Sequence, residues 1–265
     1  MMPDRSSNFM NEEATASRAQ ADRDLKAHLD EASWPMPLKL ALACRKLASE
    51  SHAETLAGQI TARASEEDTY WTTSVAGGFS NARQDTVPRI NAEGGVVEGQ
   101  GILNPGVRFH FWIYPARADV CAIMHTHPPH ASALSMSGRP LVVAHMDAAM
   151  FYEDCAYLPT WPGVPLANEE GQIVSEALDG KCSILLANHG LLTTGKTIEE
   201  ATYLAMQFER AARLQILAES IGGIQPIDEA SGRDAHDFLL QDSIVFGTFN
   251  AWSEKLLRQQ PDIAV

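Results

Sequence analysis

Two short apolar runs, each followed by histidine, constrain most strongly what this chain can fold into. The first run, Val120–Met124, is followed directly by His125-Thr126-His127, and the second, Ser183–Ala187, ends just before Asn188-His189. Runs of this length and composition are typical of buried strands. Side chains at i and i+2 of a strand point to the same face, so His125 and His127 can reach one metal ion. If the second run forms a neighbouring strand, His189 completes a set of three imidazoles with open positions, as in catalytic metal sites.

The composition is that of an ordinary globular chain. Its 265 residues are 45% hydrophobic and 20% charged, and the net charge is −14. The sequence contains no cluster of Lys and Arg that could form a basic patch, which argues against nucleic acid or an anionic membrane as a partner. No apolar run reaches the ~18 residues that a membrane span needs, and residues 1–23 lack the apolar core of a signal peptide. The four cysteines show no CxxC spacing, so we expect a cytoplasmic protein with reduced thiols.

Helix and strand patterns are interleaved along the chain. Helical patterns cover Pro37–Glu50, Val107–Tyr114, Asn168–Leu178 and the long segment after the capping box Thr197–Glu200. The β-prone segments are Gln59–Ala64 and Thr69–Thr73, followed by a hairpin at Gly94-Gly95 that joins Thr86–Ile90 to Val96–Val97. This alternation favours an α/β or α+β class. We expect a flexible N-terminal arm over residues 1–30 and a single domain over residues 31–265.

The motifs around both histidine runs resemble those of the class II aldolase/adducin family. The similar segments are Arg108–His110, Ile113–Val120, His125–His130 and Asn188–Thr193, within a region from about Leu38 to Ser220. The resemblance implies a three-layer α/β/α fold, with a central, mainly antiparallel sheet flanked by helices. It also implies a homotetramer whose sites lie near subunit interfaces. By position, His125, His127 and His189 match the family's ligands for one divalent ion per subunit, Zn²⁺ or Fe²⁺ with Mn²⁺ as a further choice, and no organic cofactor is implied.

The chain departs from the family's aldolases at the acid/base and at the phosphate site. In those aldolases, a glutamate four residues before the histidine of the Phe-His pair moves the proton α to the carbonyl; here that position is Gly106. The two small hydroxyl residues that hold the substrate phosphate are replaced by Asn104 and Pro105, and the Gly-Asn dipeptide of the first strand is Gly58-Gln59. A site without these donors would bind a phosphate dianion poorly. We therefore expect a small-molecule substrate that is a carboxylate without phosphate.

Three further side chains are candidates for catalysis. Asp147 resembles an acid/base aspartate of the family's epimerase, or it is a helix-cap or turn residue. His130 is either a substrate contact beside the ligands or a packed or capping histidine. Arg108 can pair with a substrate carboxylate through two hydrogen bonds.

Other residues are predicted to line or support the same cleft. Tyr152, Glu153 and Asp154 could reach it, Arg63 could contact a carboxylate or lie at the surface, and His110 is expected to be buried and structural. Aromatic side chains would make the cleft more apolar than a sugar site, although core packing explains most such residues. These are Trp71, Phe79, Phe109 and Trp112.

Three functions remain open from the sequence. The first is a divalent-metal-dependent lyase for a non-phosphorylated 2-oxo or 2-hydroxy acid or related carbonyl compound, acting by decarboxylation or retro-aldol cleavage through a metal-bound enediolate. Decarboxylation fits Gly106 better, because carbon dioxide leaves and no base has to remove a carbon-bound proton. The second is a non-haem Fe(II) oxygenase that oxidatively decarboxylates an aromatic 2-oxo or 2-hydroxy acid, as in aminocoumarin biosynthesis. The third is a non-enzymatic, adducin-like interaction domain, against which the intact ligands argue.

Overall fold

Eight strands form one central sheet in the order β4-β3-β2-β1-β5-β8-β7-β6. The computed structural model describes residues 12–29, 33–54, 56–163 and 168–265. In the described chain β6 and β7 form the only parallel pair, and the other strand pairs are antiparallel, so the predicted mainly antiparallel sheet is confirmed. The strands are β1 (Gln59–Arg63), β2 (Thr69–Thr72), β3 (Arg89–Asn91), β4 (Val96–Glu98), β5 (Ala122–Thr126), β6 (Cys155–Leu158), β7 (Ser183–Leu186) and β8 (Gly190–Gly195).

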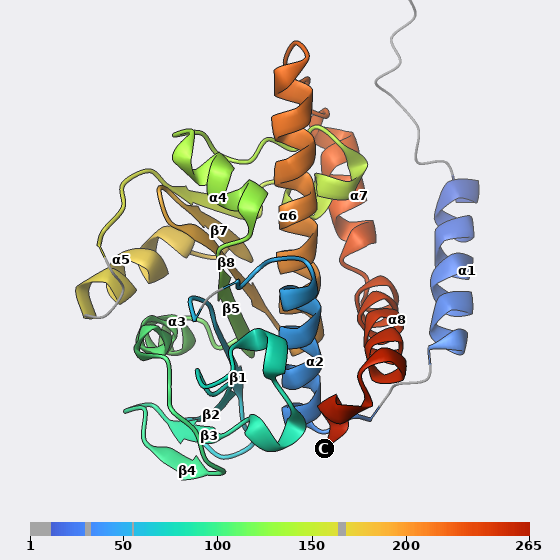
Figure 1. Cartoon of the computed structure of the whole chain (residues 1–265). Coiled ribbons are helices and arrows are strands. Elements are labelled where there is room, and N and C mark those ends of the chain that lie inside the picture. The colour runs from blue at the N-terminus through green and yellow to red at the C-terminus, as the bar shows by residue number, and fades with distance from the viewer. Residues whose placement is uncertain (1–11, 30–32, 55, 164–167) are drawn as a thin grey trace, which may run out of the picture.

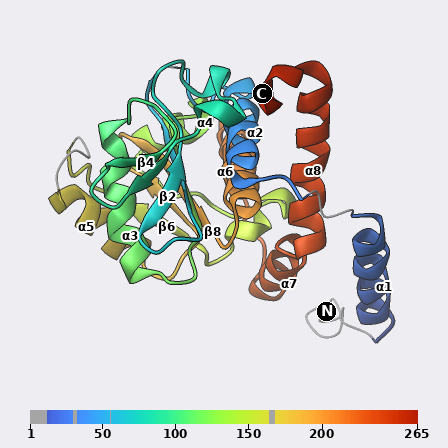
Figure 2. The same ribbon diagram turned by 90° about the horizontal axis from the view of Figure 1, so that it is seen from below.

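Helices cover both faces of this sheet, as expected for a three-layer α/β/α fold (Figure 1). The α-helices are α1 (Glu12–His28), α2 (Met36–Ser49), α3 (His110–Ala116), α4 (Pro129–Met136), α5 (Asn168–Leu178), α6 (Ile198–Ser220), α7 (Glu229–Leu239) and α8 (Asp242–Gln259). Short 3-10 helices are η1 (Phe79–Asn81), η2 (Gln84–Thr86), η3 (Pro105–Phe109), η4 (Met146–Phe151) and η5 (Pro261–Ala264). Figure 2 shows α3 and α5 on one side of the sheet and α2 and α6 on the other, with α8 outside them. No helix in the described residues is long and apolar enough to span a membrane.

Alternate residues of the central strands pack into two different cores. Ile60, Ala122 and Met124 lie in the core that α2 and α6 cover. Ile123 and Leu192 lie in the core on the other face, beneath α3 and α5. Because side chains alternate along a strand, His125 points to the same face as Ile123, the side of η3 and α3.

Most local elements lie where the periodicity predicts them. Thr197 caps α6 by accepting a hydrogen bond from the Glu200 N–H, and the Asn91 N–H donates to the Gly95 carbonyl in the predicted hairpin. The helix expected over Val107–Tyr114 is divided into η3 and α3. The expected arm of residues 1–30 contains α1, and Arg18 of this helix forms an ion pair with Asp234 of α7.

Candidate functional site

The three predicted ligands meet at one end of the sheet. His125 lies in β5, His127 follows it, and His189 lies in the turn between β7 and β8. The prediction differed in one respect, because the run Ser183–Ala187 is not the neighbour of β5. Strand β8 lies between them and pairs with both, so the tight β7–β8 turn is what carries His189 to β5. Asn188 takes a positive φ of 55° in this turn, a conformation that Asn tolerates better than most residues.

The imidazoles converge closely enough to share one ion. One ligand nitrogen from each of His125, His127 and His189 lies within 4.8 Å of the other two. The ring centroids are 4.7–4.8 Å apart, and the Nε2 atoms of His125 and His127 are 2.9 Å apart. Three nitrogen donors arranged in this way match the donor set of a catalytic divalent-metal site.

The protonation state of the three rings also suits a metal. His125 Nδ1 donates to the Leu191 carbonyl at 3.0 Å, which leaves the lone pair of Nε2 free to bind an ion. Burial is the main cause that lowers the pKa of each ring, well below its usual range for His125 and to about 4 for His189. The rings are therefore neutral near pH 7, the form that binds metal.

Two neighbours hold the ligand segment in place. Gly190 leaves room for His127, because a Cβ atom there would lie 2.6 Å from His127 Cδ2 and 2.7 Å from the Thr126 carbonyl oxygen. His52 is buried behind the strand, with Nδ1 3.0 Å from Thr126 Oγ1 and its carbonyl accepting from the His127 N–H at 3.0 Å. His52 could not be predicted from the sequence, since nothing local links it to a segment more than seventy positions away.

Two buried histidines outside the triad are expected to make folding stability depend on pH. Burial lowers the pKa of both His52 and His110 to about 3, against about 6.5 in the unfolded chain. Above pH 6.5 these histidines are neutral in both the folded and the unfolded chain. Below pH 6.5 they gain a proton only in the unfolded chain, so the free energy of unfolding decreases as the pH is lowered. Lowering the pH from 8 to 5.5 should therefore reduce the free energy of unfolding of the metal-free protein by about 1.4 kcal/mol for each of these two histidines.

Urea titrations at both pH values measure this loss. In a His52→Asn variant the loss between pH 8 and pH 5.5 should shrink by about 1.4 kcal/mol. An unchanged loss in that variant would show that His52 is protonated in the folded protein.

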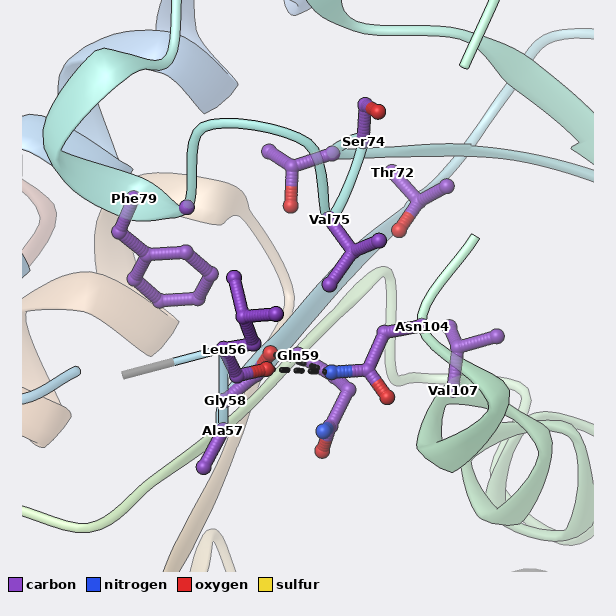
Figure 3. A pocket seen from close by; sticks show the side chains of 12 residues that line it. Leu56, Ala57, Gly58, Gln59, Thr72, Ser74, Val75, Phe79, Asn104 and Val107 are labelled. Carbon is purple, nitrogen blue, oxygen red and sulfur yellow. Dashed lines mark hydrogen bonds between the residues drawn. The ribbon is translucent and has the colours of Figure 1, made fainter. Parts of the chain in front are cut away.

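A small pocket adjoins β1 and η3, next to the strand that carries His125. Its volume is about 10 Å³, room for about one water-sized group. Figure 3 shows Gln59, Asn104, Val107 and Phe79 around it. None of the twelve described lining residues carries a charge, so this pocket offers no cation to a phosphate.

Asn104 is occupied in fixing the loop before η3. Its Nδ2 donates to the carbonyls of Leu56 and Gly58 at 2.8 and 3.4 Å (Figure 3). Its Oδ1 accepts from the Gly106 N–H at 2.9 Å. Asn104 therefore has no free side-chain donor to offer a ligand.

The three predicted catalytic residues lie outside the triad's contacts. Asp147 of η4 forms an ion pair with Arg210 of α6 at 2.8 Å. His130 begins α4, and its Nδ1 lies 2.6 Å from Glu209 of α6. Arg108 is exposed on η3. In the described part of the chain, no hydrogen bond or ring contact joins these three residues to the triad.

Glu209 of α6 is a partner of His130 that no local sequence pattern indicates. Its carboxylate accepts from the backbone N–H groups of His130 and Ala131 at 2.9 and 2.8 Å as well as pairing with the His130 ring. A carboxylate at the start of a helix satisfies N–H groups that have no partner within the helix. Glu209 thus fixes both the start of α4 and the orientation of His130.

Several residues expected near the cleft lie elsewhere. Asp154 accepts from the Cys182 N–H at 2.7 Å, before the start of β7, whereas His189 follows the end of that strand. Tyr152 and Glu153 lie with Asp154 around another pocket, beside Arg233 and His236 of α7, so the expectation that this segment lines the cleft is wrong. Arg63 donates to the carbonyls of Val120 and Tyr114 and is structural.

The aromatic lining is smaller than expected. Phe109 packs edge-on against His125, with ring centroids 5.2 Å apart, and Phe79 lines the small pocket. Trp71 instead lies beneath the Arg89 guanidinium, and Trp112 lies against Gly171 of α5. His110 is buried as predicted, with Nδ1 2.8 Å from Thr61 Oγ1.

Comparisons with known proteins cover both histidine motifs. The family model described as Class II Aldolase and Adducin N-terminal domain matches residues 38–216. The 4-hydroxy-3-prenylphenylpyruvate oxygenase/4-hydroxy-3-prenylbenzoate synthase of Streptomyces roseochromogenus subsp. oscitans is 32% identical, over 79% of this chain and 76% of that protein. Decarboxylase NovR of Streptomyces niveus is 31% identical, over 79% and 78%. The structure of L-fuculose 1-phosphate aldolase from Glaciozyma antarctica PI12 superposes with a TM-score of 0.78 over 98% of this chain and 97% of that one, at 27% identity.

Proposed function

This chain belongs to the class II aldolase and adducin family, and we propose on that premise that it is a metal-dependent enzyme that decarboxylates a 2-oxo or 2-hydroxy acid without phosphate. One observation carries the proposal. Three neutral histidines converge at a site where the position of the family's acid/base carboxylate is Gly106, with the neutral amide of Gln59 beside it. The retained ligands favour an enzyme over an adducin-like interaction domain.

In this proposal His125, His127 and His189 hold one divalent ion, Zn²⁺ or Fe²⁺ with Mn²⁺ as a further choice. When bound, such an ion supplies positive charge that polarises the oxygen atoms of a chelating substrate. The Leu191 carbonyl keeps His125 in the tautomer that binds metal, and His52 and Gly190 hold the segment that carries His127.

The absence of a carboxylate at position 106 favours decarboxylation over aldol cleavage. An aldol-type step requires a base to move a proton on carbon or oxygen, and neither Gly106 nor Gln59 can accept one. In decarboxylation the bond to the carboxyl carbon breaks, carbon dioxide leaves, and the electron pair stays on the substrate. A proton must then be added to the carbon that keeps this electron pair. His130 is the proposed donor of that proton, because Glu209 holds its Nδ1 and leaves Nε2 available. Arg108 is the proposed partner of the substrate carboxylate, and Asp147 stays a proposed acid/base.

Oxidative decarboxylation of an aromatic acid is the second candidate, with O₂ as the oxidant. The oxygenase from Streptomyces roseochromogenus, 32% identical to this chain, favours it, as does Phe109 against His125. We also propose that the protein is cytoplasmic, because its four cysteines are unpaired thiols, and that it is a homotetramer, as the family resemblance implies.

Metal content and gas exchange together test the proposed function. After anaerobic purification we expect about one divalent ion per subunit, and release of carbon dioxide from 2-oxo or 2-hydroxy aromatic acids. Uptake of O₂ in proportion to carbon dioxide, with Fe²⁺ bound, would select the oxygenase. Carbon dioxide without O₂ uptake would select the lyase. Cleavage of a phosphorylated ketose, with no carbon dioxide from either class of acid, would contradict both.

A further inference from the structure

Gln59 lies beside the metal ligand His125 in the sheet. The two residues are directly paired in the ladder between β1 and β5. Side chains of directly paired residues in an antiparallel ladder point to the same face, with Cβ atoms about 4.5–5.5 Å apart. The Gln59 amide therefore extends on the same face as the His125 imidazole, toward η3.

This amide is buried and incompletely paired. Gln59 is only 8% exposed, and its Oε1 has no hydrogen-bond partner among the described residues. Buried carbonyl oxygens almost always accept a hydrogen bond, and leaving one without a partner is unfavourable. We therefore interpret the Gln59 Oε1 as an acceptor for a donor that does not belong to this chain.

Gln59 also occupies the space that a side chain at position 106 would need. A Cβ atom on Gly106 would lie 2.9 Å from Gln59 Nε2 and 3.1 Å from its Cδ. The loop cannot easily move away, because Asn104 ties it to the carbonyls of Leu56 and Gly58. A neutral amide therefore stands where the family's aldolases have a carboxylate.

The space beside Gln59 limits the size and charge of a group that can approach it. The pocket that Gln59 helps to line has a volume of about 10 Å³ and an uncharged described lining, so the space on this side of the strand admits a group as small as a hydroxyl and not a phosphate or an ammonium ion. The hydroxyl of Thr72 in this lining already donates to the Ile60 carbonyl at 2.7 Å.

We propose that Gln59 determines specificity, because its Oε1 accepts a hydrogen bond from the hydroxyl group of a 2-hydroxy acid held at the three histidines. The proposal rests on the proposed function. A 2-oxo acid offers the same carboxylate and a second oxygen for chelation but has no hydroxyl proton to donate. The site should therefore prefer a 2-hydroxy acid to the 2-oxo acid of the same carbon skeleton.

Calorimetric binding of mandelate and phenylglyoxylate to the Zn²⁺-loaded protein tests this preference. We expect mandelate to bind about tenfold more tightly, the effect of one neutral hydrogen bond. In Gln59→Met, which keeps the length but loses the acceptor, the ratio should fall to about one while the zinc content stays unchanged. The metal-free variant should be at least as stable as wild type, because an unpaired acceptor has been removed; a purely packing role predicts a loss of stability.

Two more variants complete the test. Gln59→Asn withdraws the amide by one methylene and should lose the preference even if Gln59→Met does not fold. Thr72→Val removes a pocket hydroxyl that already donates to a backbone carbonyl, so this variant should keep the preference for the 2-hydroxy acid. Equal binding of the two acids by wild type, or a preference that survives both Gln59 variants, would overturn the role of Gln59 alone. Binding of neither acid by the zinc-loaded wild type would overturn the proposed function as well.

Discussion

Replacement of His189 by alanine is expected to reduce the metal content from about one ion per subunit to nearly zero. The substitution removes one of three converging nitrogen donors, and two imidazoles alone form an incomplete set for a divalent ion. The fold should persist, because His189 lies in a partly exposed turn and not in the packed interior. Elemental analysis after dialysis measures the metal, and circular dichroism reports the fold.

His145→Ala is the matched control for this experiment. The side chain of His145 is 57% exposed and lies outside the triad, so this variant should keep its full metal content. Full occupancy in His189→Ala would show that the ligand assignment is wrong. Loss of metal in both variants would point instead to a general effect of removing histidine.

Gly190→Ala is expected to disturb both stability and metal binding. The new Cβ atom would lie 2.6 Å from His127 Cδ2 and 2.7 Å from the Thr126 carbonyl oxygen. The His127 side chain could rotate away, but the Thr126 carbonyl at the end of β5 is held by the pairing with β8, so β8 and the segment that carries His127 must separate. We expect a loss of about 1–3 kcal/mol in the free energy of unfolding, and metal affinity about 10–100-fold weaker, as for other residues that orient ligands.

Gly180→Ala separates this effect from the general cost of replacing a glycine. A Cβ atom on Gly180 meets nothing within 4 Å, and its φ is not in the positive range. Unfolding curves and competition with a chelator, run on both variants, compare the two positions. Equal metal affinity in Gly190→Ala and wild type would show that the close approach of β8 to His127 does not position the ligand.

The fold and the three converging histidines were predictable because both depend on short-range patterns. The capping box at Thr197, the glycine pair of the hairpin and the alternation of strand residues act over a few positions. The histidine motifs are equally local, since the spacing of His125 and His127 follows from the period of a strand. These features therefore led to the correct family and fold and to the three histidines that converge.

The environment of the ligands was less predictable because it depends on strand register and helix packing. Which residue lies opposite His125 is decided by the pairing of β1 with β5, and a shift by one position would turn Gln59 to the other face. The contact of Glu209 with His130 joins α6 to α4 across 79 positions of sequence. Asp154 was placed wrongly because its closeness to Asp147 in sequence says nothing about the direction in which the chain leaves η4.

The sequence by itself determined three histidines on a mainly antiparallel sheet and a glycine, Gly106, four residues before the histidine of the Phe-His pair. Only the tertiary structure decided which side chain lies against that glycine. Position 106 and Gln59 are brought together by a loop tied through Asn104 and by a strand ladder, and neither contact is encoded by neighbouring residues. The physical reason is that donor chemistry belongs to single residues, whereas the shape and polarity of a pocket arise where distant segments pack together.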